Sequence, residues 1–292
     1  MNTKNEKHAE IDNADTEHEV EYIKGANLSI PCSFALSKFY HTHNSIFDFF
    51  FFTIDLATNS DKMFETATKT LAETARSEEE KIKYESKLSK AGFTFKRLQK
   101  FAKLQSSNIT LSVADNFLSY LSEIIQSVML KCPDVLKSSD MIKVSEILQF
   151  NKYSDIKSYL VNKKINELSY GGISEIEKYV YARFGLNIFA NDMEKYILAV
   201  LVESRNILSH NRGVINDMFI KRVEKNANDI DINLGGRFNF VVGNHIHHDL
   251  DQIAVLSNNS VSIAKRMDEL LTKKYRIPKK KFNAWLDGEN HK

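Results

Sequence analysis

The shortage of helix-breaking residues limits what this chain can fold into more than any other feature. Its 292 residues include only 10 glycines and 3 prolines, and these are the residues that most often end a helix. Between them, apolar residues recur every three or four positions, which is the spacing of one helical face. We therefore predict a mainly all-α fold built as a bundle of long helices.

The expected helices follow this apolar pattern along the chain. Residues 60–106 predict one long or two shorter amphipathic helices with a break at Gly92. Residues 108–131 predict a helix capped by Asn108 or Thr110. Further helices are expected at residues 155–168, 174–184, 191–211, 214–223 and 246–274, with a short one within 136–150. Tyr170-Gly171-Gly172 is expected to form a turn, Ser174 to cap the next helix and Gly185 to end it.

One small β-hairpin is expected near residues 230–242. Residues 230–234 and 237–242 both alternate apolar and polar side chains, as a half-buried strand does. Gly235-Gly236 between them suits a two-residue hairpin turn. This is the clearest β signal in the sequence.

Residues 26–58 are rich in aromatic side chains and contain four consecutive phenylalanines, Phe49 to Phe52. Four consecutive side chains cannot all face one side of a helix. We therefore expect an element buried all round, either between helices or at a subunit contact. A stacking platform for bases is the alternative, and core packing is the favoured interpretation.

Charge is unevenly distributed along the chain. Residues 1–21 hold seven acidic residues against two lysines, a net charge of −5, so the remainder carries +7 and the whole chain +2. A second charge feature lies near the other end: residues 273–281 hold six basic residues and no acidic one. This basic run could bind phosphate backbones or form a solvated end, and the sequence favours neither. The basic residues are Lys273, Lys274, Arg276, Lys279, Lys280 and Lys281.

The cysteines, the N-terminus and the most apolar segment bear on the cellular location of the protein. The two cysteines, Cys32 and Cys132, have neither disulfide-like nor ligand-like spacing, which fits a reducing cytoplasm. The N-terminus is polar and acidic, so no signal peptide is expected. The most apolar segment, residues 46–56, is much shorter than the ~20 residues of a membrane helix. We expect a cytoplasmic protein with no membrane contact.

The most informative stretch for function is residues 202–213, VESRNILSHNRG. It joins an apolar helix to a turn that Gly213 allows, because glycine adopts conformations other residues avoid. On a helix Asn206 and His210 share one face, and the guanidinium of Arg205 can swing toward it. An imidazole that titrates near neutrality beside a fixed cation suits phosphodiester chemistry.

The string Arg205-Asn206-x-x-x-His210-Asn211-Arg212-Gly213 resembles the R-x(4–6)-H motif of the HEPN superfamily. The extended form is similar to that of uncharacterised bacterial members, several of them associated with phage defence. The resemblance covers residues 108–275 and implies a helical bundle that dimerises, with the two motifs meeting in a metal-independent endoribonuclease site. The chain would then divide into an acidic tail (1–25), an aromatic-rich helical region (26–107), the HEPN-like domain (108–275) and a basic tail (276–292).

The resemblance also implies roles for single residues. His210 would assist proton transfer as the RNA 2′-hydroxyl attacks the adjacent phosphate, and Arg205 would stabilise charge in the transition state. Asn206 would orient His210. The products would be 2′,3′-cyclic phosphate and 5′-hydroxyl ends, with no cofactor. Arg212 is either an additional RNA contact or a helix-end cation.

Two other functional interpretations remain open. The domain could have kept the fold and lost the chemistry, acting as a dimerisation or RNA-binding module. Alternatively, residues 26–106 could serve as an adaptor for another defence protein, or the chain could bind an antitoxin.

His245-Ile246-His247-His248-Asp249 offers a possible metal site, because His and Asp lie close together there. Zinc sites normally need three or four ligands at regular spacing, so polar capping residues on an exposed first helical turn are favoured. Nucleotide-binding loops and hydrolase motifs are absent from the sequence.

Overall fold

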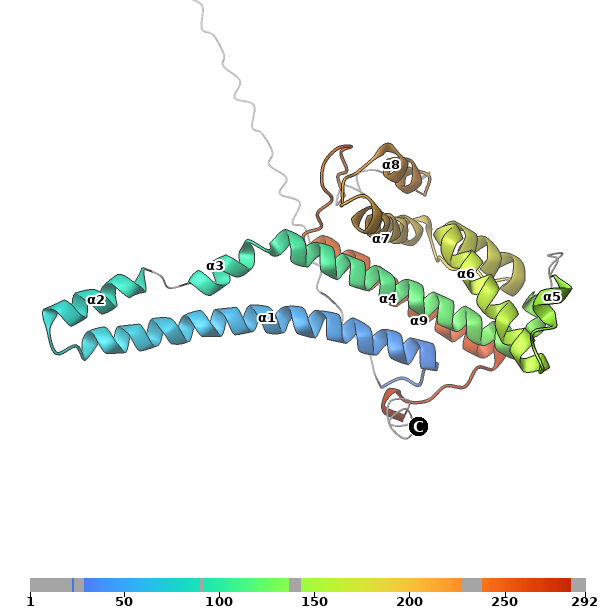
Figure 1. Cartoon of the computed structure of the whole chain (residues 1–292), viewed down its shortest axis with the longest axis horizontal. Coiled ribbons are helices and arrows are strands. Elements are labelled where there is room, and N and C mark those ends of the chain that lie inside the picture. The colour runs from blue at the N-terminus through green and yellow to red at the C-terminus, as the bar shows by residue number, and fades with distance from the viewer. Residues whose placement is uncertain (1–22, 24–28, 90–91, 137–142, 227–237, 285–292) are drawn as a thin grey trace, which may run out of the picture.

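The computed structural model describes residues 23, 29–89, 92–136, 143–226 and 238–284. These residues are mainly helical, and within them β-structure is limited to two isolated bridges, Cys32 with Lys280 and Val214 with His245. The all-α prediction is therefore confirmed. Figure 1 shows an elongated molecule with a helical body at one end and a long arm at the other.

The arm begins with α1 (Phe34–Glu73), a helix of 40 residues. The Ser33 hydroxyl caps it by accepting a hydrogen bond from the Leu36 amide at 3.1 Å. Residues 26–58 and the start of residues 60–106, expected as separate elements, therefore share one helix. No glycine or proline interrupts residues 34–73.

Two short helices complete the arm. They are α2 (Glu78–Leu88), which Ser77 caps, and α3 (Phe93–Gln99), which Gly92 precedes. The predicted break at Gly92 is confirmed, because Gly92 has φ +77°. The Asp61 carboxylate of α1 accepts hydrogen bonds from the Thr94 and Phe95 amides, at 3.1 and 2.8 Å. These bonds hold α3 beside α1.

The expected start of the next helix is wrong. α4 runs from Ala102 to Lys131, and Asn108 and Thr110 lie inside it rather than at its cap. Thr110 uses its hydroxyl to bond the Ser106 carbonyl one turn back, at 2.9 Å. The boundary expected between residues 107 and 108 falls within this continuous helix.

The Tyr170-Gly171-Gly172 turn and the Ser174 cap are also wrong. After η1 (Pro133–Leu136) and α5 (Val144–Ile147), α6 runs without a break from Tyr153 to Tyr179. Each glycine in a helix costs about 1 kcal/mol relative to alanine, and the burial of Ile173 and Ile176 nearby offsets this cost. A π turn, η2 (Val180–Phe184), follows, and Gly185 ends it at φ +59° as predicted.

The remaining helices are α7 (Asp192–His210), α8 (Asp217–Glu224) and α9 (Leu250–Tyr275). The bounds of α7 match the prediction. The other two begin three or four residues later than expected, because their caps are Asn216 and Asp249. Asp249 forms a capping box with Gln252.

The core lies where α4, α7 and α9 meet. Its fully buried side chains include Phe117 and Leu121 of α4, Leu198 and Leu201 of α7, and Met267 of α9. Tyr120, also buried, donates a hydrogen bond from its hydroxyl to the Ala264 carbonyl at 2.7 Å. α6 and the first turns of α1 cover this core (Figure 1).

The prediction for the four phenylalanines is wrong for a single copy of the chain. Phe50 is partly buried, whereas Phe49, Phe51 and Phe52 are exposed. The core contribution of this region comes instead from Phe39 and Phe47. The alternative that the phenylalanines lie at a subunit contact stays open.

The predicted hairpin lies mostly outside the described residues, including its first run and Gly235-Gly236. The described part of the second run, residues 238–242, forms no strand. Phe238 and Phe240 instead pack on His248, with ring centroids 5.8 and 6.3 Å away. None of the described helices is both long and apolar enough to cross a membrane.

Candidate functional site

The helix α7 carries the motif, and its first turn is fixed to α9. The Asn191 side chain caps the helix by accepting from the Glu194 amide at 2.9 Å. The Glu194 carboxylate holds both terminal nitrogens of Arg266, at 2.9 and 2.5 Å. Burial opposes the charge on Glu194, but the bonds from Arg266 and the Ala190 amide lower its pKa overall. The motif therefore projects from an anchored helix.

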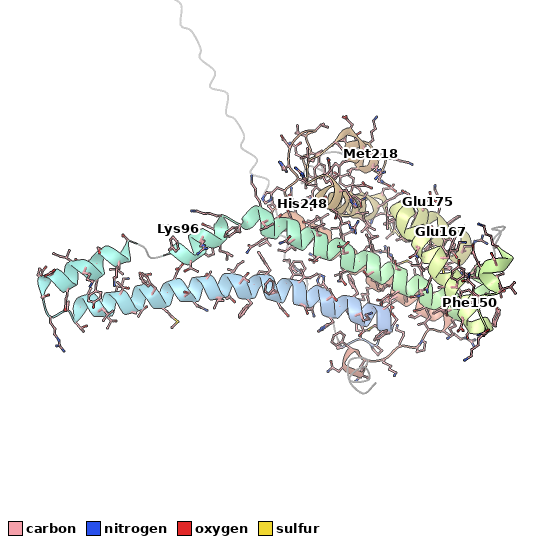
Figure 2. The ribbon with its side chains drawn as sticks, viewed as in Figure 1. Lys96, Phe150, Glu167, Glu175, Met218 and His248 are labelled. Atoms are coloured by element: carbon pink, nitrogen blue, oxygen red, sulfur yellow. The ribbon has the colours of Figure 1, made fainter. Side chains whose placement is uncertain are left out.

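Behind the motif lies a buried polar pair. The Ser204 hydroxyl donates to the Val200 carbonyl at 2.6 Å and lies 2.9 Å from Nε2 of His248. The His248 carbonyl accepts from the Ser106 hydroxyl of α4 at 2.5 Å. His248 therefore connects α4, α7 and the start of α9, and Figure 2 labels it where these elements meet. Burial lowers the pKa of His248 to about 4, so this imidazole is neutral at pH 7.

The turn after His210 has a defined geometry. Arg212 and Gly213 both adopt left-handed conformations, with φ +53° and +76°. The Asn211 and Gly213 amides both donate to the Ile207 carbonyl, at 2.9 Å each. The Gly213 carbonyl accepts from the Ile246 amide at 2.8 Å. The predicted role of Gly213 is confirmed, and the end of the motif is joined to the segment that leads into α9.

Arg205 is held by a partner that the sequence did not indicate. Its Nε donates to the Asp115 carboxylate of α4 at 2.8 Å, and both side chains retain access to solvent. The Asn206 amide donates to Glu203 at 3.4 Å, and the same carboxylate oxygen accepts from Arg222 of α8 at 3.2 Å. These contacts leave Asn206 directed to Glu203 rather than to His210.

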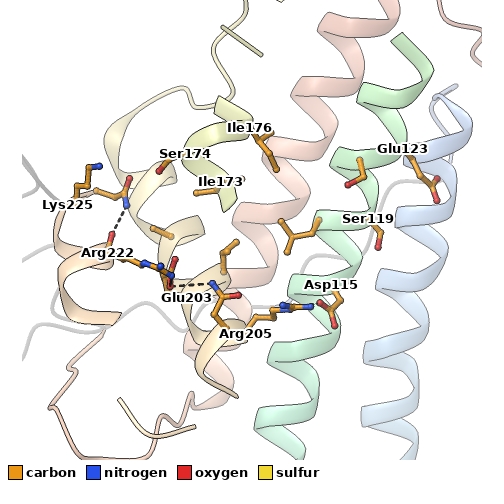
Figure 3. Close-up of a pocket in the computed structure, with 16 residues that line it drawn as sticks. Asp115, Ser119, Glu123, Ile173, Ser174, Ile176, Glu203, Arg205, Arg222 and Lys225 are labelled. Carbon is orange, nitrogen blue, oxygen red and sulfur yellow. Dashed lines mark hydrogen bonds and ion pairs between the residues drawn. The ribbon is translucent and has the colours of Figure 1, made fainter. Parts of the chain in front are cut away.

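Arg205, Asn206 and their partners line a cavity of about 720 Å³ between α4, α6, α7 and α8. Figure 3 shows Asp115 and Ser119 on one wall, Glu203 and Arg205 below, and Arg222 and Lys225 opposite. Three acidic and three basic side chains line it, so the cavity is polar and close to electrically neutral. Ile173 and Ile176 of α6 close its apolar side.

His210 and Arg212 are exposed and do not line this cavity. Arg205 and His210 are five positions apart, about 140° around the helix, and so leave α7 in different directions. A single copy of the chain therefore brings Arg205 and Asn206 together but keeps His210 outside their pocket.

The basic run lies elsewhere. Lys274 donates to the Phe184 carbonyl at 2.5 Å, and the Arg276 carbonyl accepts from Lys131. Lys280 exchanges two backbone hydrogen bonds with Cys32 before α1, at 2.9 and 3.0 Å. The C-terminal segment thus lies beside the start of α1, on the other side of α4 and α9 from α7 and α8 (Figure 1).

In the described part of the chain, His, Cys, Asp and Glu form no group of three or more that could hold a metal ion. Asp249 is a helix cap, as favoured from the sequence. His248 differs from the expected exposed position, because it is buried against Ser204.

Comparison with known proteins adds no relative. No family model matches the chain, and searches of curated proteins and of solved structures find no match. The residues and geometry of this chain therefore carry the functional argument.

Proposed function

We propose that the chain is a metal-independent endoribonuclease of HEPN type that acts in bacterial anti-phage defence or as a toxin. The observation that carries the proposal is the placement of the RNxxxHNRG string. Its arginine and asparagine enter a polar cavity, and its histidine stands exposed at the helix end.

In the proposed reaction, the RNA 2′-oxygen forms a bond to phosphorus while the bond from phosphorus to the 5′-oxygen breaks. His210 assists the transfer of the 2′-hydroxyl proton, and a proton is delivered to the leaving 5′-oxygen. Arg205 stabilises the extra negative charge on the phosphorane-like transition state. The ends formed are a 2′,3′-cyclic phosphate and a 5′-hydroxyl.

A second copy of the chain supplies the missing geometry in this proposal. Within one copy Arg205 faces Asp115, whereas His210 points away from the cavity. A two-fold contact between motif ends would bring the His210 of one copy to the Arg205 of the other. Asp115 would then orient Arg205 through their ion pair, and Asn206 would act in the cavity rather than as a direct support of His210.

The first prediction tests this site. Purified wild type should cleave total RNA in EDTA, whereas Arg205→Ala and His210→Ala should not, with circular dichroism unchanged. Mixing the two inactive variants should restore roughly a quarter of the activity. When dimers form at random, about half of them are mixed, and one of the two sites in each mixed dimer keeps both Arg205 and His210. Equal cleavage by all three proteins would contradict the assignment and indicate a contaminant.

One observation favours a different function. Both arginines of the cavity already hold carboxylates, Arg205 with Asp115 and Arg222 with Glu203. A cavity with paired cations also suits a catalytically silent module that binds RNA or a protein partner. RNA binding without cleavage by wild type and His210→Ala alike would support that alternative.

A further inference from the structure

One side of α1 carries apolar side chains that the described residues leave in solvent. Phe49, Phe52, Leu56 and Met63 are 70, 61, 58 and 73% exposed. Their spacing of three, four and seven places them on one helical stripe, with Asn59 and Thr66 in the same series. We call these six residues the outer stripe.

The outer stripe lies opposite the face that packs inside the arm. Phe47, Ala57 and Thr68 are buried on the inner face, and Asp61 there bonds the α3 backbone. Figure 1 shows α2 and α3 running along one side of this half of α1. The repeat of the outer stripe is the seven-residue pattern by which one helix packs against another.

Charged residues flank the outer stripe in an order that matches a second copy of α1. Asp48, Asp55, Lys62 and Lys69 recur every seven residues along one edge, and all four are exposed. Two acidic residues come first and two basic residues follow. If a second α1 lies antiparallel, Asp48 meets the partner's Lys69 and Asp55 meets the partner's Lys62, and two-fold symmetry repeats both pairs.

The apolar residues fit the same register. Phe52 lies opposite the partner's Met63, Leu56 opposite the partner's Asn59 and Phe49 opposite the partner's Thr66. Lys69 holds Glu65 of its own helix at 2.6 Å, and its three N–H donors allow a second carboxylate. In a parallel pair the charged edge would instead face Thr53 and Ser60, so only the antiparallel arrangement pairs opposite charges.

The area is sufficient for a specific contact. Each exposed Phe, Leu or Met of the outer stripe offers roughly 100 Å² of apolar surface, so two copies remove about 800 Å² from these side chains alone. The flanking charged residues bring the contact to about 1,200 Å², the lower end for stable interfaces.

We infer that α1 is a self-association element: two copies of this chain pair antiparallel through the outer stripe, with Asp48 and Asp55 bound to the partner's Lys69 and Lys62. This contact is separate from the α7 contact proposed above and does not depend on ribonuclease activity. If both form, losing the α1 contact removes one association step and leaves the other.

Charge reversal tests the pairing in the full chain. Asp48→Lys/Asp55→Lys makes all four edge positions basic, and Lys62→Glu/Lys69→Glu makes them all acidic. Each double variant alone should raise the Kd of this association about a hundredfold, because four attractions become repulsions. Sedimentation velocity measures the change. An equimolar mixture of the two should recover the wild-type Kd, and so should one chain carrying all four substitutions.

Glu79→Lys/Glu85→Lys is the matched control. It makes the same change in net charge as Asp48→Lys/Asp55→Lys, at exposed residues of α2, and should keep the wild-type Kd. The inference is overturned if wild type sediments as a monomer at tens of micromolar, well above a typical specific Kd. It is also overturned if the reversed variants associate like wild type, or if their mixture does not recover.

Discussion

His248 makes the stability of the folded chain sensitive to acid. Its pKa falls from 6.5 to about 4 on burial beside Ser204. Below pH 6.5 the His248 imidazole binds a proton in the unfolded chain but stays neutral in the folded chain until the pH approaches 4. The stability present above pH 6.5 is therefore lost as the pH falls toward 4, by up to about 3 kcal/mol. Urea unfolding at a series of pH values measures this loss.

His248→Gln is the informative variant, because its amide can still donate to Ser204 but does not titrate. It should be less stable than wild type at pH 7 by about 1–2 kcal/mol, yet lose less stability between pH 6.5 and 4. His247→Gln alters the exposed neighbour and should retain the wild-type slope. The same slope in His248→Gln and wild type would exclude His248 as the cause.

The sequence indicates some site residues and not others, for a physical reason. Arg205, Asn206 and His210 are recognisable because a local string at a helix end contains them. Asp115 lies 90 residues before Arg205, and His248 lies 44 residues after Ser204. Such partners are chosen by tertiary packing, and neither carries a local signal. The bond of Glu203 to Arg222 likewise follows from the packing of α8 on α7.

At the scale of elements, helix ends were predictable where a side chain or a left-handed glycine determines them. Asn191, Gly92 and Gly185 are such positions. Predictions failed where glycines stay helical, as at Gly171-Gly172 in α6, and where one helix simply continues, as in α1 and α4. Glycine permits a turn, but packing on the core decides whether the turn forms.

The turn that ends α7 gives a prediction at this scale. A Cβ at Gly213 would lie 3.2 Å from Cδ2 of Leu208, and φ is +76°. Gly213→Ala should therefore lower the free energy of unfolding by about 2 kcal/mol, from left-handed strain and crowding together. Gly243→Ala, at φ +88° with nothing within 4 Å, should cost only about 1 kcal/mol. Chemical denaturation measures both, and equal losses would show that Leu208 moves freely aside.

At the scale of the whole molecule, charge and shape separate three regions. The arm extends from one end, the motif lies at the end of α7 beside α8, and the C-terminal basic run lies beside the start of α1 (Figure 1). Phe282 is buried after this run, and Lys280 is bridged to Cys32. The basic run is thus partly built into the body, so removing residues after Leu271 would also remove packing. Substituting exposed lysines of the run therefore tests its role better than removing the segment.

If the basic run holds RNA away from the motif, its exposed lysines should set affinity but not the cleavage position. Lys279→Gln/Lys281→Gln should weaken RNA binding and reduce the slope of log K against log salt by about 1.4, the value for two phosphate contacts on a single strand. His210→Ala should do the reverse, because it acts only on the scissile phosphate: binding persists and cleavage stops. Lys81→Gln/Lys83→Gln on the arm removes the same charge and should leave the slope unchanged. Binding titrations across salt concentrations distinguish these outcomes, and an unchanged slope in the Lys279/Lys281 variant would show that the basic run is a solvated end.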